Sequence, residues 1–211
     1  MRHAVAALLR KDLTAERRTL ESIPAMTLFA VTTFVLFHFG LDRESLEGDL
    51  ASGVLWVTLL FAAVLGQNRL FVAEHEQGGF DGFLLAPVDR TAMLVAKAVA
   101  LFCFLCIVEV VALPAFAVFF SPLGVEAVLG VLLANVGICA VGTLLAAMAA
   151  ASRTRELVLP LLFLPLAIPL VVGGVGASVS EEPGRYLLFL GLYDAVFAIL
   201  CWASFEYVVS E

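Results

Sequence analysis

Long apolar stretches alternate with short polar segments along this chain of 211 residues. Six of these stretches approach or exceed the roughly 20 mostly apolar residues that a helix needs to cross the hydrocarbon core of a bilayer. They lie at about residues 23–40, 50–73, 92–120, 123–151, 157–179 and 186–209. The pattern predicts one all-α membrane domain over residues 1–211, with six transmembrane helices.

Composition and charge exclude several other classes of protein. Hydrophobic residues make up 62% of the chain, whereas a soluble domain is nearer half apolar. The net charge is −7, and no basic stripe is present, so nucleic acid is not an expected partner. The four cysteines lie in apolar stretches and indicate small buried side chains instead of a disulfide framework.

Lysine and arginine are distributed unevenly between the two sides of the predicted bundle. With the N-terminus inside, ten basic residues fall in inner segments, and only Arg43 and Arg185 fall in outer loops. The positive-inside rule therefore predicts that both termini face the cytoplasm, together with the polar segment between the second and third spans.

Residues 1–21 precede the first span and predict an amphipathic helix. Its apolar side chains, from Val5 to Leu20, lie roughly on one helical face. The basic residues on the rest of its surface are Arg10, Lys11, Arg17 and Arg18. Such a helix is typical of the membrane interface, with its basic side chains among the lipid headgroups. The alternative is a cytosolic leader of no special role.

A polar, glycine-broken segment at residues 74–90 separates spans two and three. Phe80, Phe83 and Leu84 have the spacing that places three apolar side chains on one face of a short helix. Pro87 would end that helix, because proline disfavours helical geometry in the residue before it. Such a face needs a partner, or else the segment folds back on its own bundle. The candidate contact residues are Glu74, Glu76, Gly78, Phe80, Asp81, Phe83, Leu84 and Pro87.

The stretch NRLFVAEHEQGGFDGFLLAPVDR at residues 68–90 resembles the corresponding region of ABC-2 type permeases. There, E-x-E-x-G and a following L-L-x-x-P form the coupling helix that seats in an ATPase subunit. The closer resemblance is to the heme exporter protein B family, where LDGLLLAPVDR is usual and where Phe80 and Phe83 of this chain would be leucines. The further matching stretches are LLRKDL, GVLWV, GQNRLF, VEVVALPAFAVFF and FEYV, so the resemblance covers nearly the whole chain.

The resemblance implies the membrane subunit of the cytochrome c maturation transporter, a multi-pass protein of the bacterial inner membrane. Heme would be a transient cargo and would not be covalently bound. The implied partners are an ABC ATPase subunit, a second copy of the chain, a heme-handling membrane subunit, a small membrane accessory protein, the lipid bilayer and, indirectly, a heme chaperone. The residues agree on one point: neither lysine follows glycine, so no phosphate-binding loop is present and no enzyme is expected.

Three polar residues inside the spans are candidates for a mechanistic role. Glu109 and Asp194 fall near mid-membrane, where an ionised carboxylate costs about 3 kcal/mol. They are expected to face the bundle interior, either ionised beside a pathway or partner, or protonated and hydrogen-bonded. His38 and Asn135 are candidate partners. His38, near the outer end of span one, is a transient axial ligand or a structural hydrogen-bond donor.

Span five contains three prolines, followed by GGVGAS at residues 173–178. Proline removes a helical hydrogen bond, and glycine allows a helix to break. The pattern predicts a kinked span whose outer part turns back before span six; the alternative is a straight helix that ends at Gly173.

Three functions remain open at this point. The chain is the permease subunit of a transporter that exports heme, or drives heme delivery to the periplasm, for c-type cytochrome biogenesis. Alternatively it carries no cargo and uses ATPase motion to release a heme-loaded chaperone, or it is an ABC-2 permease for another cargo.

Overall fold

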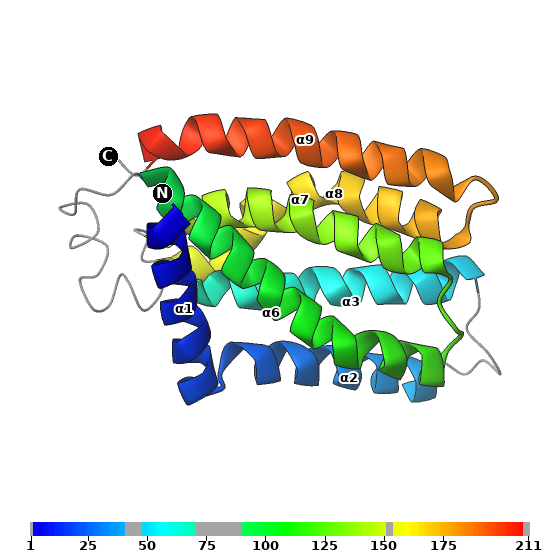
Figure 1. Ribbon diagram of the computed structural model, residues 1–211. Coiled ribbons are helices and arrows are strands. Elements are labelled where there is room, and N and C mark those ends of the chain that lie inside the picture. The colour runs from blue at the N-terminus through cyan, green and yellow to red at the C-terminus, as the bar shows by residue number, and fades with distance from the viewer. Residues whose placement is uncertain (1, 41–47, 71–89, 151–153, 209–211) are drawn as a thin grey trace.

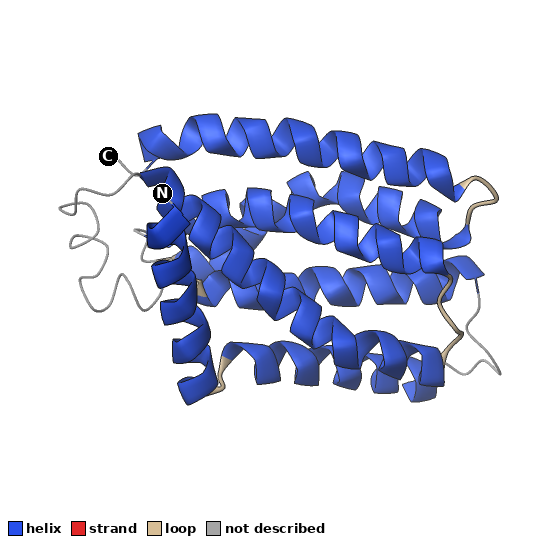
Figure 2. Ribbon diagram, in the orientation of Figure 1, coloured by secondary structure: helices blue, strands red, loops and turns tan. Residues whose placement is uncertain are grey.

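The computed structural model describes residues 2–40, 48–70, 90–150 and 154–208, and within these ranges all regular structure is helical (Figures 1 and 2). The helices are α1 (Arg2–Thr19), α2 (Ser22–Gly40), α3 (Gly48–Arg69), α6 (Arg90–Phe119), α7 (Val125–Ala150), α8 (Arg155–Val179) and α9 (Pro183–Val208). Six of them, α2 to α9, are long and apolar enough to cross a membrane. The predicted all-α architecture with six spans is therefore confirmed.

The six long helices run side by side and alternate in direction along the chain (Figure 1). Helix α7 packs against α6, α8 and α9, and α2 packs against α3 and α6. Helices α2 and α9 lie at opposite edges of the bundle in this view. Both described chain ends lie at the same end of the bundle, which we call the α1 end; the opposite end is the far end.

Helix α1 lies across the α1 end, transverse to the long helices, and packs against α6 (Figure 1). Val5, Leu8, Leu9 and Leu13 are half-buried in this position. The turn to α2 consists of Leu20 and Glu21, and Leu20 has a φ of 49°. This left-handed conformation is uncommon for a bulky residue, so it marks a sharp corner between the two helices.

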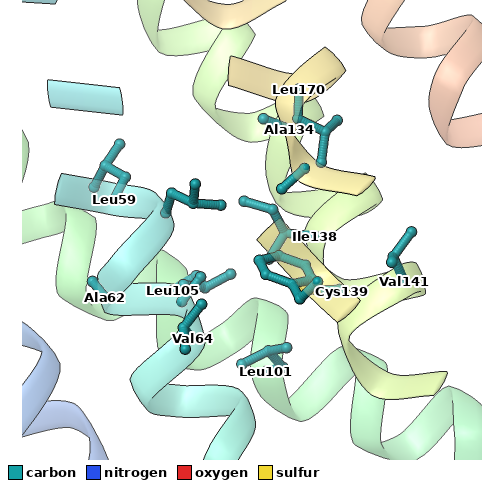
Figure 3. Packing of buried hydrophobic residues seen from close by; sticks show 14 of the residues in the cluster. Leu59, Ala62, Val64, Leu101, Leu105, Ala134, Ile138, Cys139, Val141 and Leu170 are labelled. Carbon is teal, nitrogen blue, oxygen red and sulfur yellow. The ribbon is translucent and has the colours of Figure 1, made fainter. Parts of the chain in front are cut away.

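The core is made of close contacts between small and large apolar side chains of neighbouring helices. Leu59 of α3, Leu105 of α6, Ile138 of α7 and Leu170 of α8 converge in it (Figure 3). Lipid tails are as apolar as leucine, so burial from lipid gives little driving force and dispersion between well-packed surfaces holds such helices together. Complementary packing at each position is therefore the main source of stability in this bundle.

Helix α8 continues without a break to Val179, with Pro160, Pro165 and Pro169 inside it. The prediction of an outer part that turns back is wrong, as is the alternative that the helix ends at Gly173. In hydrocarbon no water replaces a broken backbone hydrogen bond, so a glycine run is no helix terminator there. These glycines instead admit large neighbouring rings. A Cβ at Gly174 would overlap the Trp56 ring, and one at Gly176 would overlap Tyr186.

Candidate functional site

A buried ion pair joins α1 to α6 at the α1 end. Lys97 is the eighth residue of α6, and its Nζ lies 3.1 Å from each carboxylate oxygen of Asp12. The two side chains are 5% and 11% exposed, respectively. A charge in a poorly hydrated place is tolerated when a partner compensates it, so this pair fixes α1 on the first turns of α6.

A second buried carboxylate on α1 binds the start of α2. The backbone N–H groups of Ser22 and Ile23 both donate to Glu16 Oε1, at 2.9 and 2.8 Å. The first N–H groups of a helix have no partner inside the helix, and they carry its positive dipole end. Glu16 therefore caps α2 from the preceding helix. Arg69 adds an exposed ion pair with Glu21 of the corner, at 2.9 Å.

The residues predicted to contact an ATPase lie outside the described part of the chain. They are Glu74, Glu76, Gly78, Phe80, Asp81, Phe83, Leu84 and Pro87. The helices that flank this segment are described: α3 ends at Arg69 and α6 begins at Arg90, both at the α1 end (Figure 1). Any force applied to residues 74–90 therefore reaches the bundle beside α1.

The basic side chains of α1 are on its exposed surface. Arg10, Lys11, Arg17 and Arg18 are all exposed, while Asp12 and Glu16 lie on the face toward the bundle. The helix is thus divided by charge, with its carboxylates inward and its cations outward. This arrangement is compatible with cations placed among lipid headgroups, a role that stays a prediction.

Glu109 of α6 pairs with Asn135 of α7 in the middle of the bundle. The Asn135 Nδ2 group donates to both carboxylate oxygens, at 2.8 and 2.9 Å, and both residues are buried. Of the two partners considered from the sequence, Asn135 makes the contact. The pair fixes α6 against α7 through a directional polar contact within an apolar core; whether it also has a mechanistic role stays a prediction.

Asp194 of α9 is buried against α7 but lacks a well-formed hydrogen bond. Its Oδ1 lies 2.6 Å from the position that a Cβ on Gly137 would occupy, and no hydrogen bond of good geometry from the described residues reaches either oxygen. Its neighbour Tyr193 instead donates to the Leu166 carbonyl, at 2.7 Å. Asp194 therefore depends on the absence of a side chain at residue 137.

His38 lies at the far end among aromatic rings. Its ring centroid is 4.8 Å from Phe39, 5.4 Å from Phe119 and 6.0 Å from Phe120. Within the described ranges, no group of three or more histidine, cysteine or acidic side chains is placed to hold a metal ion. Ligation by His38 stays a prediction, and its observed contacts are those of a packed aromatic cluster.

The same end contains the contact of Trp56 with α8. The Trp56 Nε1–H donates to Ser178 Oγ at 3.1 Å, and the Ser178 hydroxyl donates to the Gly174 carbonyl at 2.8 Å. Below Trp56, a small cavity opens between α3, α7 and α8. Its lining includes Leu60, Asn135 and Leu170, so one polar side chain faces an otherwise apolar space.

Together these observations define a multi-pass helical membrane protein in which α1 is held by charged contacts at one end of the bundle. The family described as CcmB protein matches residues 3–205. Heme exporter protein B of Rhodobacter capsulatus is 30% identical over 207 residues, which cover 94% of this chain and 95% of the relative. The protein of the same name from Bradyrhizobium diazoefficiens is 30% identical over 205 residues (95% and 90%), and that from Pseudomonas aeruginosa is 31% identical over 191 residues (85% and 84%). The chain belongs to the CcmB family, which confirms the resemblance seen in its sequence.

Sequence reasoning did not identify three charged residues at the α1 end, the buried Glu16 and Lys97 and the partly buried Asp12. A signal was present for the two carboxylates, which lie four residues apart on the helical face of Leu8 and Leu9. Acidic residues on the apolar face of an amphipathic helix indicate buried partners. The identity of those partners required the fold, since Asp12 and Lys97 are 85 residues apart.

Proposed function

We propose that this chain is the membrane subunit of an ABC transporter that exports heme, or drives heme delivery to the periplasm, for c-type cytochrome biogenesis. The similarity to proteins named heme exporter protein B, over nearly the full length of both chains, carries the proposal. The six membrane-spanning helices support it, because they supply a permease body without any additional domain in the described part.

The energy for this function would come from a separate ABC ATPase. The Gly-Lys-Ser/Thr element of a phosphate-binding loop does not occur in the sequence. Residues 74–90 are the proposed contact for that ATPase on the cytoplasmic side of the bacterial inner membrane, where both termini would also lie. A second copy of the chain, a heme-handling membrane subunit and a small accessory protein complete the proposed assembly.

The packing of the bundle favours a particular form of this function. Side chains of neighbouring helices occupy the space beside several glycines: Met26 beside Gly66, Gln67 beside Gly142 and Leu190 beside Gly173. The helices of one subunit are thus in direct contact where these glycines lie. This supports the second candidate function, in which the subunit carries no cargo and transmits ATPase motion that releases a heme-loaded chaperone from a neighbouring membrane subunit.

Loss of the gene in its host tests the proposal. We expect c-type cytochromes to lose their covalent heme, measured by heme-dependent peroxidase staining, and to regain it when the wild-type chain is restored. Phe83→Asp should fail to restore them and should no longer co-purify with the ATPase, because a charge would replace an apolar contact. Glu182→Gln, an exposed change at the far end, is the matched control. Normal cytochromes without the gene would contradict the proposal.

Reconstitution in vesicles separates the two forms of the function. ATP-dependent movement of heme across the vesicle membrane by the complete complex supports export. Release of a heme-loaded chaperone without heme crossing supports the mechanical form.

A further inference from the structure

Two carboxylates on α1 bind two different membrane-spanning helices. Asp12 is paired with Lys97 of α6, and Glu16 accepts the backbone N–H groups of Ser22 and Ile23 in α2. The two carboxylates are four residues apart on one face of α1, a separation of about 6 Å along the helix axis. One turn of α1 is thus attached to α6 on one side and to α2 on the other.

These attachments differ from the exposed ion pairs of the same region. Exposed pairs are solvated and contribute roughly 0–1 kcal/mol. Lys97 and Glu16 are only 4% and 7% exposed, so separation of either contact would take one compensating partner away from a charge in a poorly hydrated place. Displacement of α6 at this point therefore moves α1 more readily than it breaks the Asp12–Lys97 contact.

We propose that α1 is a mechanical link from α6 to α2, with Asp12, Lys97 and Glu16 as its positioning residues. This inference rests on the proposed function, since the displacement would come from an ATPase acting on residues 74–90. It goes further in assigning α1 a role in energy transfer, beyond contact with the membrane surface.

The connectivity of the chain supports a link of this kind. Helix α6 begins at Arg90, directly after the proposed ATPase contact, and Lys97 lies two turns further on. Lys97 contacts Asp12 of α1. Glu16, one turn further along α1, contacts the first residues of α2. The corner between α1 and α2 has only two residues, Leu20 and Glu21, so the two helices cannot separate far.

The helix that receives the link, α2, has contacts at both of its ends. Helix α2 is at the edge of the bundle and packs against α3 and α6. Toward the far end it carries Phe34, whose ring packs against Phe116 of α6 and against Phe120, the residue directly after α6. Helix α2 is therefore connected to α6 twice, through α1 at one end and through these rings at the other.

The test uses the complete complex, reconstituted with its ATPase, and compares heme delivered with ATP hydrolysed. We expect Asp12→Asn and Lys97→Gln to lower the ratio of delivery to hydrolysis by about fivefold or more, the lower end of typical coupling energies. Hydrolysis itself should change by less than about twofold, because the ATPase contact is elsewhere. The exchanged pair Asp12→Lys with Lys97→Asp should restore the ratio.

Arg10→Gln is the matched control, because it removes an exposed charge from the same helix. A purely structural role for the ion pair would lower delivery and hydrolysis together and leave their ratio unchanged, which would overturn the proposal. If Lys97→Gln fails to accumulate, the exchanged pair decides: accumulation with a restored ratio supports the link, and accumulation with a low ratio contradicts it.

A distance measurement keeps the link separate from the proposed function. Spin labels at exposed Ala7 of α1 and Val99 of α6 should keep a constant separation through the nucleotide cycle in the wild type and should separate in Lys97→Gln. A wild-type complex that delivers no heme contradicts the proposed function, whereas the labels still report whether α1 follows α6. Label distances that change equally in both proteins overturn the link.

Discussion

The two ends of the bundle are held together by different kinds of contact. At the α1 end, the contacts are ionic or charge-assisted: Asp12 with Lys97, and Glu16 with the start of α2. At the far end, rings fill the space left by glycines, as Trp56 does at Gly174 and Tyr186 at Gly176. The charged contacts hold α1 to its neighbours through a few directional partners, whereas the rings hold neighbouring helices through close packing over a wider surface.

This difference predicts that the α1 end responds to an applied displacement and that the far end stays rigid. A displacement of α6 at the α1 end would act on the Asp12–Lys97 pair and the Glu16 cap, whose strength depends on their geometry. At the far end, α8 cannot slide past α3 or α9 without overlap of the Trp56 or Tyr186 ring with its backbone. The following changes test this division, from the largest expected effect to the smallest.

Gly174→Leu should destabilise the protein most, by about 3 kcal/mol, because its side chain would occupy the space of the Trp56 ring. Thermal unfolding of the purified protein in detergent measures the change. Gly191→Leu is the matched control on a neighbouring span, since nothing lies within 4 Å of a Cβ there. An equal loss of stability in the two variants would show that the packing of the Trp56 ring on Gly174 does not determine the effect.

Glu109→Ala should cost about 2 kcal/mol, because it leaves the buried Asn135 amide without its partner. Glu109→Gln should cost less, since its amide oxygen still accepts from Asn135. Asp194→Asn has no well-formed hydrogen bond to lose and should cost least of the three. The same unfolding measurement orders the variants, and a larger loss for Asp194→Asn than for Glu109→Ala would contradict this account.

Glu16→Ala should cost about 1 kcal/mol, the usual effect of removing a helix cap. Hydrogen exchange at the amides of Ser22 and Ile23 should increase in the variant, because both N–H groups lose their acceptor. Exposed Arg17→Ala on the same helix leaves these amides bonded. Unchanged protection in Glu16→Ala would show that the cap is not needed to hold the start of α2.

Arg69→Gln should have the smallest effect, about 0.5 kcal/mol or less, because its partner Glu21 and its own side chain are both largely exposed. Added salt should reduce the difference between variant and wild type. A loss as large as that of Glu16→Ala would mean that the exposed pair belongs to the same rigid unit as the buried ones.

The six spans could be predicted from the sequence because span length is a local property of the chain. Each apolar stretch must cross the hydrocarbon by itself, so its existence does not depend on its neighbours. The course of α8 could not be predicted in the same way. Glycine and proline are common helix breakers, but Gly174 and Gly176 in this helix make room for rings that come from other helices.

The polar contacts show a similar limit. The need of Glu109 for a partner followed from the cost of a charge in hydrocarbon, yet the choice of Asn135 over His38 required the relative rotation of α6 and α7. The ion pair of Asp12 with Lys97 depends on how α1 crosses the bundle. Sequence patterns indicate which groups need partners, and packing determines which partners they obtain.

The two-residue corner at Leu20 and Glu21 has a consequence for how the protein sits in a bilayer. If the exposed arginines of the transverse helix α1 lie among the lipid headgroups, as predicted, the short corner to α2 would let their depth set the vertical position of the spans. A thicker or thinner bilayer cannot then be accommodated at this end. The mismatch would fall on the opposite surface, around His38 and its phenylalanine neighbours.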